Sequence, residues 1–329
     1  MGAVMGAESC GSRLIGRLAP SPTGAQHLGN ARTFLIAWLF LRSQDGQVIL
    51  RIEDLDTPRT KSWANAQAIE DLQWLGLDWD LVAPLQSTRN SKYSDVLEEL
   101  KARELVYPCS CSRSQIEACC SAPHESFLDG VVYSGQCSSR TVADAQRLDA
   151  NGQGYAWRFR FEKGTMRWND DYLGLQELDT KTALGDFVVA RNYGPAAYQL
   201  AVTVDDHLQG ITHVARGDDL VYSTYRQLAI YNAMGWDAPR WMHVPLVVGV
   251  DGRRLAKRHG DTRLATWRAQ GKRPEEILGW IASSIGLSHN HAPRSASELL
   301  QLACQDSHWW QKIPKQPWVF DSDSIPESN

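Results

Sequence analysis

The stretch RLAPSPTGAQHLGN, residues Arg17–Asn30, carries a specific strand–loop–helix pattern. Apolar residues over 14–19 predict a strand, and the Pro, Ser and Gly residues that follow predict a tight loop. A helix is expected to begin at Gly29 and Asn30. Its free amides and positive dipole end suit a phosphate, which the side chains of His27 and Asn30 could also reach. The alternative is an ordinary strand–helix connection with Asn30 as the cap.

Strand and helix patterns alternate along most of the chain. A strand at 47–52 and a helix at 62–75 predict the start of a parallel α/β sheet. After an inserted α+β segment, which includes the alternating stretch 155–161, strands are expected at 197–204, 211–215 and 241–248. Helices are expected at 274–286 and 295–304, followed by a frayed tail from Trp318. The expected divisions are an N-terminal extension, a first α/β half, the insert, a second α/β half and a short helical region, at 1–13, 14–100, 101–180, 181–261 and 262–329.

The composition is that of an ordinary globular protein. The 329 residues are 43% hydrophobic and 22% charged, and the longest apolar run, 34–41, is too short to cross a bilayer. The first residues lack the apolar stretch of a signal peptide, so we expect no membrane partner and a cytoplasmic location. The net charge of −4 argues against binding nucleic acid by bulk charge. An RNA contact would need a local patch, for which charge alone suggests Arg158, Arg160, Lys163 and Arg167.

Seven cysteines are distributed unevenly, with five of them close together. An odd number without an export signal makes a disulfide framework improbable. The clustered residues instead indicate a possible metal site, and buried free thiols are the alternative. They are Cys109, Cys111, Cys119, Cys120 and Cys137.

Three further stretches carry polar side chains next to expected strands. RIEDLDTPR, at 51–59, is either a solvated charge run or a ligand site at a strand end. The stretch 197–220 contains Tyr198 and Arg216, which could both bind a substrate. The alternative for Tyr198 is a core aromatic, and the alternative for Arg216 is an ion pair with Asp218 or Asp219. GRRLAKRHGD, at 252–261, is a basic loop that could simply be solvated.

Together, these pieces occur in an order that resembles class I aminoacyl-tRNA synthetases of the glutamyl/glutaminyl branch. The resemblance implies a Rossmann-like catalytic domain with an inserted zinc-binding-like segment, and ATP with Mg²⁺ as the nucleotide substrate. It implies ATP binding by His27, Gly29, Asn30 and Lys257, with catalytic roles for His27, Asn30 and Lys257. It assigns glutamate contacts to Arg17, Leu18, Ala19, Pro20, Ser21, Glu53, Tyr198 and Arg216. The lysine loop departs from the family pattern at Arg254, Leu255 and Ala256.

Length and the cysteines narrow the resemblance to a truncated branch, the glutamyl-queuosine tRNA(Asp) synthetases. Only 68 residues follow Asp261, too few for the anticodon-binding portion of full glutamyl-tRNA synthetases. In this branch one structural Zn²⁺ is held by residues that resemble Cys109, Cys111, Tyr133 and Cys137, although Cys119, Cys120 and His124 leave the fourth ligand open.

The expected partners are L-glutamate and tRNA(Asp) carrying queuosine, with the protein acting as a monomer. The expected reaction forms glutamyl-adenylate without tRNA and then transfers glutamate to the queuosine base. The alternatives are a minimal glutamyl-tRNA synthetase that charges a tRNA 3′ end, and a non-catalytic paralogue that binds glutamate or tRNA.

Overall fold

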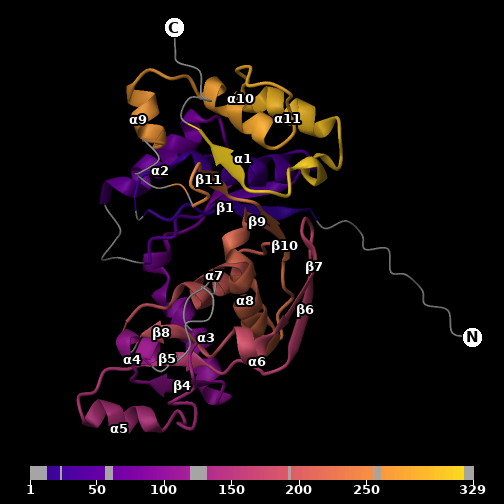
Figure 1. Ribbon diagram of the computed structural model, residues 1–329. Helices are drawn as coiled ribbons and strands as arrows, with labels where there is room; N and C mark the ends of the chain where they lie inside the picture. The colour runs from indigo at the N-terminus through magenta and orange to yellow at the C-terminus, as the bar shows by residue number, and fades with distance from the viewer. Residues whose placement is uncertain are drawn as a thin grey trace, which may run out of the picture.

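The computed structural model describes residues 13–22, 24–55, 62–118, 132–191, 194–253, 255 and 261–321. The molecule is elongated in Figure 1, with α1 and the C-terminal helices at one end and α4, α5 and their neighbouring strands at the other. Two helices, α7 and α8, lie between these ends. No helix among the described residues is long and apolar enough to span a membrane.

A parallel sheet forms the N-terminal half. Its strands are β1 (Ile15–Leu18), β2 (Gln47–Leu50) and β3 (Leu81–Val82), in that order. Helices α1 (Leu28–Arg42) and α2 (Ser62–Trp74) connect them. The predicted strands at 14–19 and 47–52 and the helix at 62–75 are therefore confirmed, apart from their end residues.

The second α/β half forms a separate sheet whose strand β9 lies beside β1. The main chain of Thr212, next to β9 (His213–Gly217), donates to the Ile15 carbonyl at 2.9 Å. Strand β10 (Arg240–Val244) then pairs in parallel with β9, and α8 (Val221–Met234) connects the two through the short 3₁₀ helix η2 (Asp218–Leu220). Parallel strands with helical crossovers confirm the predicted α/β class.

The segment between the halves forms its own antiparallel sheet. Strand β5 (Ala156–Phe159) lies between β4 (Val106–Cys109) and β8 (Phe187–Arg191). The flanking helices are η1 (Gln86–Thr88), α3 (Asn90–Ala102), α4 (Arg113–Ala118), α5 (Asp144–Ala150) and α6 (Thr180–Ala183).

A hairpin of the same segment joins the second half instead. Strands β6 (Thr165–Asp170) and β7 (Gly174–Asp179) are antiparallel, and β6 pairs with β10. Strand pairing thus crosses residue 180 in both directions, and the domain boundaries stay a prediction.

Two of the predicted strands differ from the structure. The run 197–204 is not a strand but the start of α7 (Tyr198–Leu208), whose residues 200–206 are all buried. An apolar run that is buried on every side has the same composition in a helix as in a strand, which explains the error. The stretch 241–248 is not one strand, because Pro245 separates β10 from β11 (Val247–Gly249) and cannot donate to a strand ladder.

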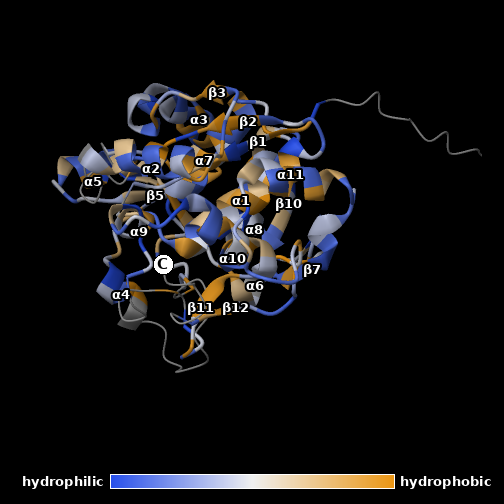
Figure 2. Ribbon diagram, turned by 90° about the horizontal axis from the view of Figure 1, so that it is seen from above, coloured by the Kyte–Doolittle hydropathy of each residue, from blue (hydrophilic) through white to orange (hydrophobic). Residues whose placement is uncertain are grey.

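The C-terminal region is helical, as predicted. It contains α9 (Leu264–Ala269), α10 (Pro274–Ser284), α11 (Ala296–Cys304) and the 3₁₀ helix η4 (Trp309–Lys312). The expected fraying of 318–329 is wrong for its first three residues, because β12 (Trp318–Phe320) pairs in parallel with β11 and Phe320 packs 5.8 Å from Trp280, between ring centroids. Residues 322–329 lie outside the described residues. Figure 2 shows hydrophobic residues gathered around α1, α7 and the neighbouring strands.

Candidate active site

A cavity of about 470 Å³ opens where the carboxyl ends of β1 and β9 meet the N-terminus of α1. Ligands bind in this position in open α/β sheets, because the strand order changes direction there. The cavity is lined by polar residues from all of the N-terminal motifs and from the 197–220 stretch. Nine of the predicted site residues line it, namely Arg17, Ala19, Ser21, His27, Gly29, Asn30, Glu53, Tyr198 and Arg216.

Three predicted site residues do not line the cavity or lie outside the described residues. Leu18 is fully buried in the core, and its carbonyl accepts from the main chain of Arg51 at 2.9 Å. Pro20 is buried, and its carbonyl accepts from the Glu53 main chain at 3.0 Å. Both residues hold β1 and β2 together beneath the cavity. Lys257 lies outside the described residues.

The N-terminus of α1 is capped by the residues predicted to bind ATP. Gly29 N–H donates to His27 Nδ1 at 3.1 Å, and the main chain of His27 donates to Asn30 Oδ1 at 3.2 Å. In neutral His27 the proton is therefore on Nε2, which makes that atom a donor. A Cβ on residue 29 would lie 3.0 Å from His27 Cε1, so glycine leaves the space that the ring needs. The helix therefore begins at Leu28, and its N-cap is His27 rather than the expected Asn30, which completes a capping box from the third helical position.

The chain returns to this helix end after the lysine loop. Leu28 N–H donates to the Thr262 carbonyl, and Leu264 N–H donates to the Gln26 carbonyl, both at 3.0 Å. On the other side of the loop, Val247 of β11 lines the cavity. The chain before and after the lysine loop therefore lies beside the N-terminus of α1.

Buried ion pairs form the floor of the cavity. Asp206 of α7 accepts from Arg17 Nε at 3.3 Å and from Arg51 Nη1 at 2.7 Å, while Arg51 Nη2 lies 3.1 Å from Glu53 Oε1. Burial raises the pKa of Glu53, although Arg51 and Arg17 oppose the rise. Binding of an ammonium group would therefore stabilise the Glu53 carboxylate. Sequence reasoning missed Asp206, and the only signal was the acidic pair Asp205-Asp206 at the end of an apolar run.

Arg216 lines the cavity, and one nitrogen of its guanidinium lacks a hydrogen-bond partner among the described residues. Its Nε donates to His243 Nε2 at 3.0 Å and its Nη2 to Thr224 Oγ1 at 2.6 Å, rather than to the carboxylates of the alternative interpretation. Arg216 Nη1 is buried and has no hydrogen-bond partner among the described residues. Burial lowers the pKa of this arginine, so a carboxylate ligand would both pair Nη1 and compensate the buried charge.

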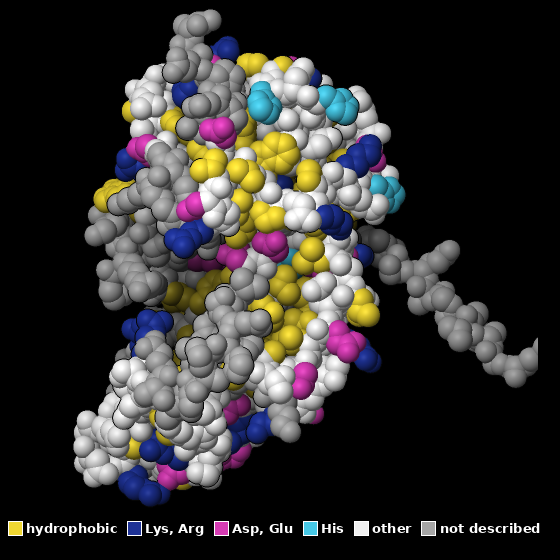
Figure 3. Space-filling view, in the orientation of Figure 1, with side chains coloured by type: hydrophobic (Ala, Val, Ile, Leu, Met, Phe, Trp, Pro, Cys, Tyr) yellow, Lys and Arg dark blue, Asp and Glu magenta, His cyan; other side chains and the backbone are white. Residues whose placement is uncertain are grey.

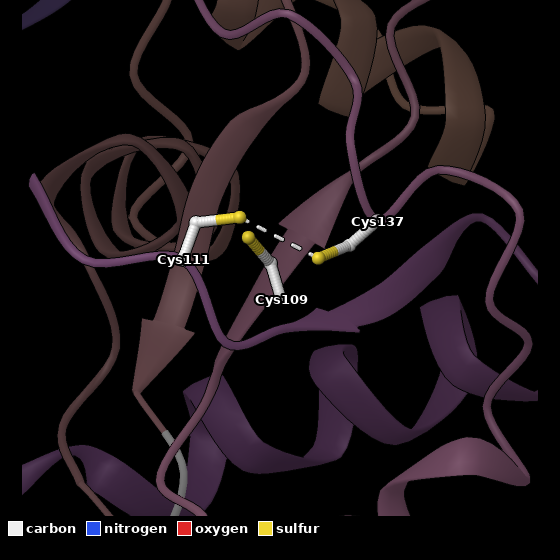
Figure 4. A group of neighbouring side chains, drawn as sticks. All are labelled: Cys109, Cys111 and Cys137. Atoms are coloured by element: carbon white, nitrogen blue, oxygen red, sulfur yellow. Dashed lines mark hydrogen bonds between the residues drawn. The ribbon is translucent and has the colours of Figure 1, made fainter. Parts of the chain in front are cut away.

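The second candidate site is a group of three cysteines in the insert that could bind a metal ion. Figure 4 shows the sulfur atoms of Cys109, Cys111 and Cys137 pointing toward one another, and all three lie within 4.8 Å. Cys111 and Cys137 are 3.6 Å apart between sulfurs, too far for a disulfide. Tyr133 Oη lies 3.4 Å from Cys109 Sγ and 3.7 Å from Cys111 Sγ. The predicted ligand set is therefore brought together, whereas Cys119, Cys120 and His124 lie outside the described residues.

A family model described as the catalytic domain of class I tRNA synthetases (E and Q) matches residues 13–326. The chain belongs to this family. It is 48% identical to the glutamyl-Q tRNA(Asp) synthetase of Rhodopirellula baltica, over 94% of this chain and 97% of that protein. It is 39% identical to glutamate–tRNA ligase 2 of Syntrophus aciditrophicus, over 94% of this chain but 64% of that one. The crystal structure of a glutamate tRNA ligase from Elizabethkingia meningosepticum in complex with its amino acid superposes with a TM-score of 0.78, at 28% identity, over 95% of this chain and 68% of that chain.

The structure of this synthetase also places the four cations suggested as RNA contacts. Arg158 is only 8% exposed, and its guanidinium lies over the Tyr133 ring at 3.9 Å from the centroid. Arg160 donates to the carbonyls of the main chain around it, including Ser138 at 2.6 Å. Arg167 is exposed but pairs with Glu177, and Lys163 is exposed. On the face of the molecule that Figure 3 displays, the basic side chains are interspersed with acidic ones.

Proposed function

We propose that this synthetase activates L-glutamate with ATP and transfers the glutamyl group to the queuosine base of tRNA(Asp). The observation that carries the first half is the unpaired Nη1 of Arg216, buried in a cavity that also holds Glu53. The second half is supported by the 48% identity, along nearly the full length of both chains, to a protein named glutamyl-Q tRNA(Asp) synthetase.

The cavity provides complementary groups for the three charges of glutamate. Arg216 offers Nη1 to a carboxylate, and Arg17 lines the same cavity. Glu53 offers a carboxylate to the α-ammonium group, while Tyr198 and Ser21 border the space. Glutamine lacks the second negative charge, so a buried guanidinium without an anion would disfavour it.

ATP would bind at the N-terminus of α1. The free amides of the first turn, His27 and Asn30 would contact phosphate, and Lys257 would neutralise charge on the phosphates. Among the described residues only the three cysteines form a group of three metal-binding side chains, so Mg²⁺ would be bound mainly through the ATP phosphates. The α-carboxylate oxygen of glutamate then attacks the α-phosphorus, the bond to the β,γ-diphosphate breaks, and pyrophosphate leaves.

In the transfer step, a hydroxyl of the queuosine ring attacks the carbonyl carbon of glutamyl-adenylate. An ester forms, AMP leaves, and the hydroxyl proton passes to solvent or to a phosphate oxygen. Because a carboxylate is already a nucleophile at neutral pH, alignment and charge neutralisation carry most of the catalysis in the first step.

The cysteine cluster would hold one structural Zn²⁺. Sulfur ligands at about 2.3 Å from a tetrahedral zinc lie about 3.8 Å apart, close to the 3.6 Å between Cys111 and Cys137. Tyr133 is the fourth candidate, although burial raises the pKa of its phenol. Zinc would fix β4 to the chain around residues 133–137 and thereby stabilise the insert.

The first test measures exchange of labelled pyrophosphate into ATP with glutamate and without tRNA. Glutamate-dependent exchange is expected, and glutamine should support much less. Absence of exchange with every amino acid would contradict activation and favour the non-catalytic alternative. Glutamate is also expected to bind in calorimetry, with the Arg216→Ala variant as the control that loses binding.

The second test loads labelled glutamate onto tRNA(Asp) with and without queuosine. Label is expected only on queuosine-containing tRNA, and nuclease digestion should recover it in the anticodon fragment. Label on the 3′-terminal fragment would instead identify a minimal glutamyl-tRNA synthetase. Since tRNA and ATP are cytoplasmic, we also propose that the enzyme acts there. Its action as a monomer stays a prediction, which analytical ultracentrifugation would test.

A further inference from the structure

We propose that His243, oriented by Asp170, is a positioning residue that holds the Arg216 guanidinium with Nη1 directed into the glutamate cavity. The inference deepens the proposed function and rests on it, because it assumes that Arg216 binds a substrate carboxylate. His243 itself would not touch glutamate.

Three adjacent strands bring these residues into a row. His243 of β10 is the register partner of Arg216 on β9, and Trp241 of β10 is the register partner of Asp170 on β6. Asp170, His243 and Arg216 are exposed by only 4%, 0% and 5%. The row therefore runs through the interior of the sheet to the cavity wall.

The hydrogen bonds fix the direction of the row. Asp170 is held by main-chain donors, with Leu173 N–H at 2.7 Å and Tyr172 N–H at 2.9 Å, both to Oδ1. Its Oδ2 lies 2.7 Å from His243 Nδ1. An ionised carboxylate can only accept, so Nδ1 of His243 carries the proton and donates.

The other ring nitrogen is then an acceptor for the arginine. With the proton on Nδ1, neutral His243 has a lone pair on Nε2, 3.0 Å from the Nε of Arg216. Burial lowers the pKa of His243 to about 4, so the ring remains neutral at assay pH. An imidazolium could not accept from a guanidinium, and the neutral state is the one that this contact requires.

Two contacts together define the plane of the guanidinium. His243 holds Nε, and Thr224 Oγ1 accepts from Nη2 at 2.6 Å. A rigid planar fork held at two nitrogens leaves the third, Nη1, in one place. A merely packed histidine would fill the same volume without specifying which nitrogen faces the cavity.

Two substitutions distinguish the contact of His243 Nδ1 with Asp170 from the contact of its Nε2 with Arg216. The amide oxygen of Gln in His243→Gln reaches the Nε2 position and can still accept from Arg216. The amide of Asn in His243→Asn reaches only the Nδ1 position, so it keeps a donor to Asp170 and loses the contact with Arg216. His213→Gln is the control, because His213 is a partly buried histidine of β9 that contacts Thr212 Oγ1 through Nδ1 and lies in a tilted arrangement 5.8 Å from Phe40, between ring centroids, rather than beside Arg216.

The readout is the KM for glutamate against kcat and the KM for ATP in pyrophosphate exchange. Loss of one hydrogen bond to a charged group predicts about a tenfold or greater rise in glutamate KM for His243→Asn. His243→Gln is expected to stay within about threefold of wild type, and His213→Gln should match wild type. Equal glutamate KM for wild type and His243→Asn would overturn the inference, as would equal losses in the Asn and Gln variants.

A measurement on the unaltered protein covers the case in which the variants fail to fold. Nitrogen NMR of ¹⁵N-histidine-labelled enzyme should show one histidine with protonated Nδ1 and unprotonated Nε2 that does not titrate between pH 6 and 8. A protonated Nε2 at His243 would overturn the inference. Absence of glutamate-dependent exchange in wild type would instead overturn the proposed function, and the assigned role of His243 with it.

Discussion

Arg51 Nη1 and Asp206 Oδ1 form a 2.7 Å ion pair directly beneath the glutamate cavity. Both side chains are almost completely enclosed, with 0% and 2% exposure. The Coulombic attraction of Arg51 and Arg17 overcomes the burial of Asp206 and lowers its pKa. The pair joins the end of β2 to α7. Because Asp206 also pairs with Arg17 and Arg51 also pairs with Glu53, it positions both of these side chains at the cavity.

Removing the Asp206 charge is expected to destabilise the fold. In Asp206→Asn two arginines lose their carboxylate, and breaking a buried pair costs about 3–5 kcal/mol of unfolding free energy. Urea denaturation followed by circular dichroism measures the loss. Glu177→Gln, which breaks the exposed pair with Arg167, is the control and should leave stability nearly unchanged. Similar losses in both variants would show that burial of the pair is not what matters.

Glutamate binding and adenylate formation should respond to different substitutions. Arg216→Ala is expected to raise the glutamate KM in pyrophosphate exchange by about tenfold or more, because a charged hydrogen bond is lost. Lys257→Ala should mainly lower kcat, because its charge acts on the phosphates. Arg216→Lys should restore little, since an ammonium group cannot contact His243, Thr224 and a carboxylate in one plane. Wild-type exchange in both alanine variants would refute the site assignment.

Gly29→Ala tests the packing of His27 at the start of α1. The new Cβ would lie 3.0 Å from His27 Cε1 and force the ring away from the helix end. We expect a higher KM for ATP, because the displaced His27 ring would no longer be held at the helix end by its contact with the residue 29 amide. Gly154→Ala, where a Cβ meets nothing within 4 Å, is the matched control. An unchanged KM for ATP would mean that His27 does not contact the nucleotide.

Zinc content tests the cysteine cluster independently of catalysis. Purified protein is expected to contain about one zinc per chain, and Cys137→Ser should lose most of it and melt at a lower temperature. Cys304→Ser is the control, because Cys304 is an exposed free thiol away from the cluster. Equal zinc content in the two variants would exclude Cys137 as a ligand.

The contact between α2 and α9 predicts a particular pH dependence. Asp71 lies 3.0 Å from Arg268 Nη1, and burial raises its pKa to about 6 despite that partner. The folded chain therefore binds more protons than the unfolded chain between about pH 4 and 6, so this group's contribution to stability is lost as pH rises through 6.

Asp71→Asn removes this titration. The melting temperature of the variant, relative to wild type, should be higher at pH 8 than at pH 5. Glu177→Gln, at an exposed carboxylate whose pKa Arg167 lowers, should show a difference from wild type that does not change between pH 5 and 8. If Asp71→Asn also gave a pH-independent difference, the raised pKa would be disproved.

The strands and helices that are flanked by Pro and Gly residues could be predicted from sequence. The Pro and Gly residues of 17–30 marked the first loop, and nine of the proposed site residues indeed line one cavity. Contacts between distant segments could not be predicted in this way. Phe320 gave no local sign of pairing with β11, and α7 was misread because its residues 200–206 are all buried.

The same limit explains the residues that sequence reasoning missed. Asp170 and His243 are far apart in the chain and meet only because β6 and β10 are neighbours. Arg158 was suggested as an RNA contact on charge alone, yet strand pairing buries it against Tyr133. Charge in a sequence does not distinguish a surface cation from one that packs inside.

The pairing of β11 with β12 determines when the sheet beside the lysine loop can form during synthesis of the chain. Strand β11 leads into the lysine loop, and its partner β12 follows the C-terminal helices in the chain, so β11 cannot pair with it until those helices have been synthesised. A chain released by a stop codon before Trp318 would contain every glutamate-cavity residue named above but would lack the strand that braces the nucleotide side. We expect such a fragment to lose pyrophosphate exchange even though its proposed glutamate contacts are present.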